Sequence, residues 1–238
     1  MIKDKQIIAF DADDTLWATE DYFREAEKKF SKIINCHENH EETMKLHFES
    51  ILQNMPIYGF GIKAFVLSSL EAAVKITKKQ LSNEQMMAII NIGKEMLNAK
   101  VELLPEVENT LKKLKEHYQL VVLTKGDLLD QQRKLKESGL SCYFEHMEVM
   151  SDKKTKDYEI LFRLFNINAR EFTMIGNSLK SDVLPIVELG GCGIHIPYHT
   201  TWEYEQMDMN TIDQTKYHSL VSMSELPELL EKINRKKE

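Results

Sequence analysis

Two carboxylates near the start of the chain have the spacing that nucleophilic and acid–base chemistry requires. Asp11 and Asp13 follow four apolar residues typical of a buried strand, and alternation along the chain places both on one side, with Ala12 between them. Carboxylates this close repel each other unless a divalent cation or a shared proton lies between them. One can then attack while the other transfers a proton. The alternative is a polar turn that caps a helix, because Asp and Thr are favoured in both places.

Two further predicted strands are followed by residues suited to binding an anion. Strand 119–124 ends at Thr124, and Lys125 comes next, just before a predicted helix. A hydroxyl and free backbone N–H groups at a helix start form an anion site, although Thr is also a common helix cap. A short strand further along is followed by Lys153 and Lys154. A lysine there could neutralise a phosphate, and a solvated lysine pair is the alternative.

A third strand, 172–176, is followed by Asn177, Ser178 and Asp182. All three side chains carry oxygen donors of the kind that a hard cation such as Mg²⁺ prefers. In a parallel sheet, ligands bind outside the carboxyl ends of the strands, so these residues and Asp11 fall where chemistry is expected. Four successive strand ends with carboxylates, a hydroxyl, a lysine and a carboxylate indicate one shared site.

The elements that position these residues are an α/β core and a helical insert. Strand-like segments separated by helical ones predict a doubly wound parallel sheet, with strands at 7–10, 119–124, 147–150, 172–176 and 192–196. Between residues 17 and 98 the apolar spacing is helical throughout, which is too long for a simple crossover. We therefore predict an α/β core domain of residues 1–16 and 99–238, with an inserted all-helical cap domain of residues 17–98.

Three local patterns add detail. Ser82 with Gln85 three residues later predicts a capping box that opens a helix. The run 195–202 follows a strand end and is interpreted as packing over the core, with a functional role as the alternative. Within the insert, Met44, Phe48, Ile51, Leu52 and Met55 recur at helical spacing and predict a helix.

Composition narrows the function classes. The 238 residues carry a formal net charge of −7, which argues against binding nucleic acid, although a small anionic substrate remains compatible. No apolar run approaches the ~20 residues of a membrane span. The three cysteines, Cys36, Cys142 and Cys192, are widely spaced and show no metal-type pairing. We expect a cytoplasmic, reduced protein with no membrane and no nucleic-acid partner.

Taken together, these segments resemble the haloacid dehalogenase superfamily, specifically its phosphatase branch. The four motifs of that family match residues 11–16, residues 123–124, Lys153, and residues 176–178 through Asp182. The resemblance covers nearly the whole chain, and the helical block resembles the mobile cap that the family inserts after its first motif. It implies hydrolysis of a small phosphorylated metabolite with Mg²⁺ as cofactor.

The resemblance also implies roles for individual residues. Asp11 would attack phosphorus to form an aspartyl-phosphate, and Asp13 would protonate the leaving oxygen and then activate water. Thr124 and Lys153 would bind the phosphoryl group, and Lys125, from its place at the same strand end, is a further phosphate-binding candidate. Mg²⁺ would be bound by Asp11, by the backbone carbonyl of Asp13, and by the fourth motif through Asn177 and Asp182.

Several alternatives stay open. The family usually has an aspartate where Asn177 stands, so Asp182 would supply charge directly or through water. Lys153 is preferred over Lys154 because Tyr158 follows at the family spacing. The rival functions are a phosphomutase of the same family and a non-catalytic phosphate-binding or regulatory module. A dehalogenase is disfavoured because that branch lacks an acid at the position of Asp13. The sequence identifies neither the substrate nor the oligomeric state.

Overall fold

The computed structural model describes residues 6–34, 40–78 and 80–235, and its chain divides into two compact units. The α/β unit comprises Met1–Glu20, Val101–Thr124 and Arg133–Glu238, and the helical unit comprises Asp21–Lys100 and Lys125–Gln132. The helical unit thus includes a short segment from well beyond residue 98. The predicted domain boundaries stay a prediction.

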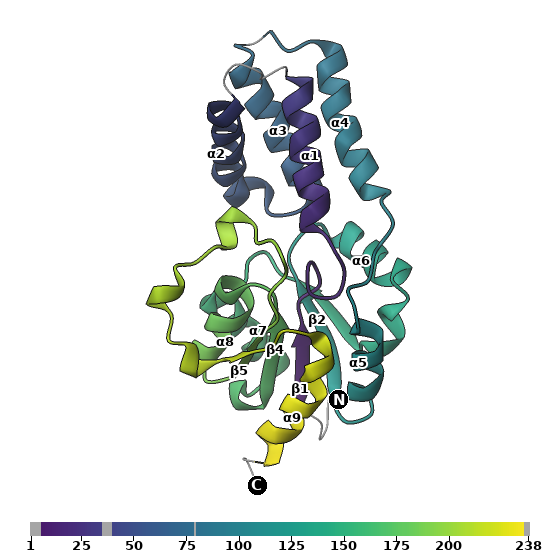
Figure 1. Cartoon of the computed structure of the whole chain (residues 1–238), viewed down its shortest axis with the longest axis vertical. Coiled ribbons are helices and arrows are strands. Elements are labelled where there is room, and N and C mark those ends of the chain that lie inside the picture. The colour runs from purple at the N-terminus through teal and green to yellow at the C-terminus, as the bar shows by residue number, and fades with distance from the viewer. Residues whose placement is uncertain (1–5, 35–39, 79, 236–238) are drawn as a thin grey trace. The chain divides into compact units, whose positions relative to one another are not determined.

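The α/β unit is built on a sheet of six parallel strands, which confirms the predicted fold class. The strands are β1 (Ile7–Phe10), β2 (Gln119–Thr124), β3 (His146–Val149), β4 (Phe172–Gly176), β5 (Cys192–His195) and β6 (His218–Ser219). Their order is β3-β2-β1-β4-β5-β6, and Figure 1 shows β1 between β2 and β4. Five of these strands were predicted to within one residue at either end. The two-residue β6 is too short to leave a periodic pattern in the sequence.

The central strands β1, β2 and β4 are buried on both faces of the sheet, which explains their mainly apolar character. In β1, Ile8 and Phe10 pack on the side of α5 (Val107–Leu114) and α9 (Leu226–Arg235). Ile7 and Ala9 point to the other face, towards α7 (Thr155–Phe165) and α8 (Leu184–Glu188). Because successive side chains alternate between faces, a strand covered on both sides must be apolar at every position.

The order in which strands are added to the sheet reverses at β1, and a binding site is expected at this point. From β1 the chain builds β2 and β3 to one side, and β4, β5 and β6 to the other. Phe10 is in register with both Val122 and Ile175. The carboxyl ends of β1, β2 and β4 therefore lie together, at the topological switch point where ligands of such folds bind.

Short helices fill the connections between the main elements. The helix α6 (Leu128–Glu137) follows β2. The remaining turns are η1 (Leu140–Tyr143), η2 (Ala169–Glu171), η3 (Leu179–Val183), η4 (Glu203–Glu205), η5 (Met209–Thr211), η6 (Gln214–Lys216) and η7 (Met223–Glu225). All are single 3₁₀ turns except η3, which is a π-helix. The long connection between β5 and β6 contains η4, η5 and η6 and packs Tyr217 and Ile212 against Leu179 and Val183.

The helical unit contains α1 (Glu20–Ile33), α2 (His40–Tyr58), α3 (Ile62–Ile76) and α4 (Asn83–Leu97). Its core includes Phe30, Phe65 and Ile89. The predicted capping box is confirmed: the Ser82 hydroxyl accepts from the backbone N–H of Gln85, whose side chain accepts from the Ser82 N–H. This reciprocal pair satisfies two donors that α4 would otherwise leave open.

The helix predicted from the apolar spacing is present as α2, but its most deeply buried face is polar. Met44, Phe48, Ile51, Leu52 and Met55 are only half-buried. The fully buried positions of α2 are instead polar, namely Thr43, His47, Ser50 and Asn54. These residues lie three or four positions apart, so they form a stripe on one face. Hydrogen bonds from His47 to Ser69 and from Asn54 to Ser68 join that stripe to α3, which is why polar side chains can occupy it.

Among the described residues, no helix is long and apolar enough to cross a membrane. Cys36 lies outside the described residues, whereas Cys142 is exposed and Cys192 is half-buried.

Candidate active site

Asp11 stands at the carboxyl end of β1, where the sheet fixes its position. Its backbone N–H donates to the Ile175 carbonyl of β4 at 2.8 Å, which continues the parallel ladder by one residue. The buried carboxylate contacts the Lys153 ammonium through Oδ1, while Oδ2 lies 3.4 Å from the Thr15 hydroxyl. Burial raises the pKa of Asp11 to about 7 even though the Lys153 ammonium lowers it, and the charge of Asp182 adds to the rise. The buried position therefore disfavours the ionised form of Asp11 by more than the Lys153 ammonium favours it.

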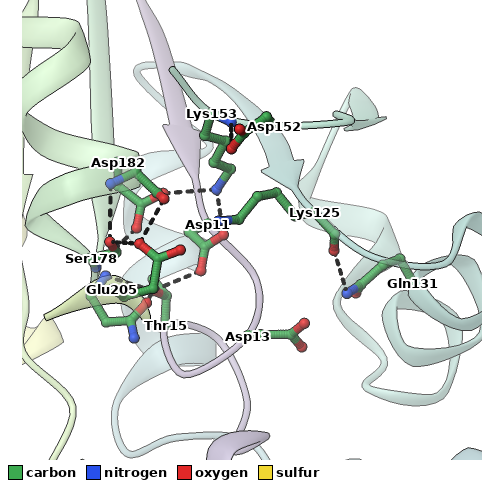
Figure 2. Close-up of polar contacts among 12 residues, drawn as sticks. Asp11, Asp13, Thr15, Lys125, Gln131, Asp152, Lys153, Ser178, Asp182 and Glu205 are labelled. Atoms are coloured by element: carbon green, nitrogen blue, oxygen red, sulfur yellow. Dashed lines mark hydrogen bonds and ion pairs between the residues drawn. The ribbon is translucent and has the colours of Figure 1, made fainter. Parts of the chain in front are cut away.

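Lys153 is the cation at the centre of the site. Its side chain is 1% exposed, and its ammonium contacts Asp11 and lies 2.8 Å from Asp182 Oδ1. Burial by itself would lower the pKa of Lys153, but the two carboxylates raise it above its ordinary value, so the group stays charged. Figure 2 shows Lys153 reaching between the two carboxylates. The neighbouring Lys154 is 71% exposed and pairs with Asp152 instead, so only Lys153 joins this group.

The turn after β4 brings two more predicted residues to Asp11. The Asn177 N–H donates to Thr15 Oγ1 at 3.1 Å, and the same hydroxyl lies 3.3 Å from Asn177 Oδ1. Asp182 Oδ2 accepts from the Ser178 N–H at 3.0 Å, while Oδ1 accepts from Lys153. Both oxygens of the buried Asp182 are thus engaged by the protein itself.

Gly176 makes this arrangement possible. A Cβ at Gly176 would lie 2.1 Å from Asp182 Oδ2, which is closer than any two such atoms can approach. The absence of a side chain therefore lets the carboxylate of Asp182 fold back over the end of β4. In this way the last residue of a strand determines the position of an acid six residues later.

Asp13 is placed differently from Asp11. Its Oδ1 accepts hydrogen bonds from Trp17 Nε1 at 2.8 Å and Thr19 Oγ1 at 2.7 Å, and it lies 2.5 Å from Lys134 Nζ of α6. Burial would raise the pKa of Asp13, but the Lys134 ammonium and these hydrogen bonds outweigh burial and lower it. Figure 2 shows its carboxylate directed away from Lys153 and Asp182. The structure therefore brings Asp13 to the same loop as Asp11 without joining it to the Lys153 group.

Thr124, the last residue of β2, and Lys125, the next residue, belong to different units. Thr124 is buried at the strand end, where its carbonyl accepts from the Met150 N–H at 2.8 Å. Lys125 groups with the helical unit, where its ammonium lies 4.3 Å from the ring centre of Phe60 and its carbonyl accepts from Gln131. A role for Lys125 in binding phosphate stays a prediction.

Sequence reasoning missed two residues that contact this site, Lys134 and Glu205, and it favoured a packing role for a third, His195. Lys134 pairs with Asp13, His195 Nε2 lies 3.0 Å from the Asn177 carbonyl, and Glu205 accepts from the hydroxyls of Ser178 and Ser181. Burial lowers the pKa of His195 despite that carbonyl, which favours the neutral ring that donates through Nε2. His195 closes β5, and this strand-end position is the reason for the functional alternative given to the run 195–202. Lys134 and Glu205 lie inside a helix and a long connection, where no motif distinguishes them.

The oxygen donors at this site fit a hard divalent cation that needs only one or two carboxylate ligands. No group of three or more His, Cys, Asp or Glu side chains that could hold a metal occurs within the described ranges. However, Asp11 Oδ2 and Asn177 Oδ1 both lie within reach of the Thr15 hydroxyl, so a carboxylate oxygen and an amide oxygen converge on one point. Mg²⁺ is commonly bound by one or two carboxylates together with waters and substrate phosphates. The residues present are compatible with that pattern.

Comparisons with known proteins agree with this geometry. A family model described as haloacid dehalogenase-like hydrolase matches residues 5–190. Glyceraldehyde 3-phosphate phosphatase from Pyrococcus furiosus is 27% identical over 137 residues, which cover 55% of this chain and 54% of that protein. The match thus spans about half the length of this relative.

Two solved structures extend the comparison. A haloacid dehalogenase-like family hydrolase from Xanthomonas campestris has a TM-score of 0.84 and 31% identity, over 98% of this chain and 93% of that one. A 2-haloacid dehalogenase from Pseudomonas syringae pv. Tomato has a TM-score of 0.64 and 20% identity, over 96% of this chain and 99% of that one. The second likeness concerns the fold alone.

Proposed function

Because the chain belongs to the haloacid dehalogenase-like hydrolases, we propose that it is a Mg²⁺-dependent phosphatase acting on a small phosphorylated metabolite. The reaction proceeds through an aspartyl-phosphate on Asp11. The observation that carries the proposal is the buried contact of Asp11 with Lys153 at the switch point of the sheet, with a second acid, Asp13, two residues later. A nucleophile, a fixed cation and an acid are the groups that hydrolysis of a phosphate ester needs.

In the first step, an oxygen of Asp11 forms a bond to phosphorus while the bond from phosphorus to the ester oxygen breaks. Lys153 and the Thr124 hydroxyl hold the phosphoryl oxygens in line, and Lys125 adds positive charge from the same loop. Phosphoryl transfer depends mainly on such positioning and charge neutralisation. Asp182 acts on this step indirectly, because it anchors the ammonium of Lys153 at 2.8 Å.

Asp13 acts as the general acid in the first step and as the general base in the second. It donates a proton to the leaving alkoxide, and it then removes one from the water that attacks the aspartyl-phosphate. Phosphate leaves, and Asp11 is regenerated. This role requires the Asp13 carboxyl to turn from Lys134, Trp17 and Thr19, which hold it in the ionised form.

Mg²⁺ would be held by the Asp11 carboxylate, the Asp13 backbone carbonyl and the Asn177 amide oxygen, and Asp182 would supply negative charge directly or through water. When bound, it reduces the repulsion between the attacking carboxylate and the phosphate. The convergence of Asp11 Oδ2 and Asn177 Oδ1 on Thr15 supports this assignment.

A phosphatase is favoured over a dehalogenase by Asp13. Expulsion of halide needs no proton, whereas an alkoxide leaving group does. The Pyrococcus furiosus relative, which is named as a phosphatase of glyceraldehyde 3-phosphate, supports a small phosphorylated metabolite as the substrate class. Residues 17–98 would form a cap that selects this substrate, because loops over a constant core can change specificity without changing the chemistry.

The experiment is phosphate release from an aryl phosphate, measured with Mg²⁺ and with a chelator. Asp11→Asn preserves the shape of the side chain but removes the nucleophile, so turnover should be abolished. Asp208→Asn, which changes an exposed aspartate on the β5–β6 connection, is the matched control and should behave as the wild type. Full activity of Asp11→Asn would overturn the mechanism. Transfer of the phosphoryl group back to the substrate, without net release, would identify a mutase instead.

A further inference from the structure

The connection between β5 and β6 places a carboxylate against the turn that follows β4. Glu205 lies in η4, and its Oε2 accepts from the hydroxyls of Ser178 at 2.5 Å and Ser181 at 2.7 Å. Figure 2 shows this carboxylate next to Ser178 and close to Asp182. Hydrogen bonds to an ionised acceptor are about twice as strong as neutral ones. A single oxygen of Glu205 therefore joins two side chains of one turn.

The preceding residue binds the same turn from a second direction. Lys180 Nζ donates to the Tyr204 carbonyl at 2.6 Å, and the ammonium lies 3.6 Å from the ring centre of Tyr204. Residues 204 and 205 thus contact side chains at positions 178, 180 and 181. Two adjacent residues that bind three positions of one turn restrict its rotation as well as its position.

The bound turn is the one that carries the proposed cation ligands. Ser178 follows Asn177, and its N–H donates to Asp182 Oδ2 at 3.0 Å. The Ser178 hydroxyl accepts from the Ser181 N–H at 3.0 Å, so its own hydrogen is directed to Glu205. This turn is a π-helix, an arrangement that is rare and usually short, and that occurs often at functional sites. Side-chain support of the kind that Glu205 gives can maintain it.

We propose that Glu205 is a positioning residue for the metal site: by fixing Ser178 and Ser181 it holds Asn177 and Asp182 towards Asp11 and strengthens Mg²⁺ binding. The inference rests on the proposed function, because the cation is part of that function. Asn177 is uncharged, so Glu205 also adds negative charge next to the site from a segment distant in sequence. Residues that orient metal ligands typically change affinity or activity by about 10–100-fold when removed.

The test is a calorimetric titration of the intact protein with Mg²⁺ alone, together with the Mg²⁺ dependence of aryl phosphate hydrolysis. In Glu205→Ala, Mg²⁺ should bind about tenfold more weakly. Excess Mg²⁺ should restore kcat, while KM for the aryl phosphate stays at the wild-type value. Glu203→Ala is the matched control, because Glu203 lies in the same turn with an exposed side chain. It should bind Mg²⁺ as the wild type does.

Glu205→Gln keeps the volume and can still accept from both serines, so it should fall between the wild type and Glu205→Ala. It also carries the test if Glu205→Ala does not fold. Unchanged Mg²⁺ affinity in these variants, with or without a lower melting temperature, would overturn the role of Glu205 and leave the phosphatase proposal intact. Failure of the wild type to bind Mg²⁺ would overturn both.

Discussion

Each unit of this protein contains a cluster of buried polar side chains, and the two clusters differ in charge. In the α/β unit, the buried groups at the switch point are charged: Asp11 and Asp182 contact Lys153. In the helical unit, the polar stripe between α2 and α3 consists of hydroxyls, an amide and one imidazole. A buried charge is costly unless it is paired, whereas a neutral polar group needs only a hydrogen bond. The charged cluster thus lies at the proposed active site, and the neutral stripe joins two helices.

His47 shows how the helical unit keeps its polar stripe neutral. The Ser69 hydroxyl donates to the Phe65 carbonyl at 2.7 Å, so the Nε2–H of His47 must donate to Ser69 Oγ, 2.8 Å away. His47 Nδ1 then has no hydrogen-bond partner within the described part of the chain, and the ring stacks on Phe30 with centres 4.2 Å apart. Burial lowers the pKa of His47 to about 4, because a proton on Nδ1 would add a charge with no acceptor. The imidazole is thus a neutral donor at physiological pH.

The largest effects on stability and turnover are expected when Lys153 is removed from its contacts with Asp11 and Asp182. Lys153→Met leaves two buried carboxylates without their cation, which should lower the free energy of unfolding by about 3–5 kcal/mol. It should also reduce turnover of an aryl phosphate by about a thousandfold, because a fixed positive charge is lost at the phosphoryl group. Denaturant unfolding and steady-state kinetics measure the two effects.

The adjacent lysine provides the control. Lys154→Met removes a side chain that is 71% exposed, so it should change the free energy of unfolding by about 0.5 kcal/mol or less and leave turnover unchanged. Equal losses in the two variants would show that the site depends on overall charge and not on the buried contact.

The charged group could be predicted from the sequence because parallel strands bring their carboxyl ends together. Asp11, Lys153 and Asp182 each follow a strand closely, so recognising the strands was sufficient to place all three at one edge. Lys134 and Glu205 could not be predicted in this way. Lys134 is 121 positions from Asp13, and only the packed structure decides which surface of α6 meets that loop.

The neutral stripe could not be predicted for a different reason. The spacing of Met44, Phe48 and Ile51 is helical, and an apolar stripe usually marks the buried face. On α2 the polar stripe is the more deeply buried one, because hydrogen bonds to Ser68 and Ser69 satisfy it. Those partners lie on another helix, so a pattern confined to α2 carries no sign of them.

The buried neutral His47 of the helical unit also predicts how the free energy of unfolding depends on pH. The pKa of His47 is about 4 in the folded protein and near 6.5 when unfolded, so the unfolded chain binds more protons between these values. Stability due to neutral His47 is therefore complete above pH 6.5 and is lost as the pH falls towards 4. The loss between pH 7 and pH 5 should be about 2 kcal/mol.

Urea unfolding of the wild type and of His47→Leu at both pH values isolates this contribution. The difference between the two proteins removes the effect of carboxylates common to both. Ser69 stays satisfied in the variant because it donates to Phe65. If the wild type and the variant lose the same free energy of unfolding between pH 7 and pH 5, His47 must already be accessible to protons in the folded state.

The smallest effect is expected from a charged pair that the helical unit leaves in solvent. Lys29 of α1 and Glu95 of α4 are 2.7 Å apart, yet their side chains remain 45% and 61% exposed. Water screens such a pair, so Glu95→Gln should change the free energy of unfolding by about 0.5 kcal/mol or less, and less still in high salt. Urea unfolding at low and high ionic strength tests this. A loss as large as that of Lys153→Met would mean that the distance between opposite charges, and not their burial, determines what a charged pair contributes to this protein.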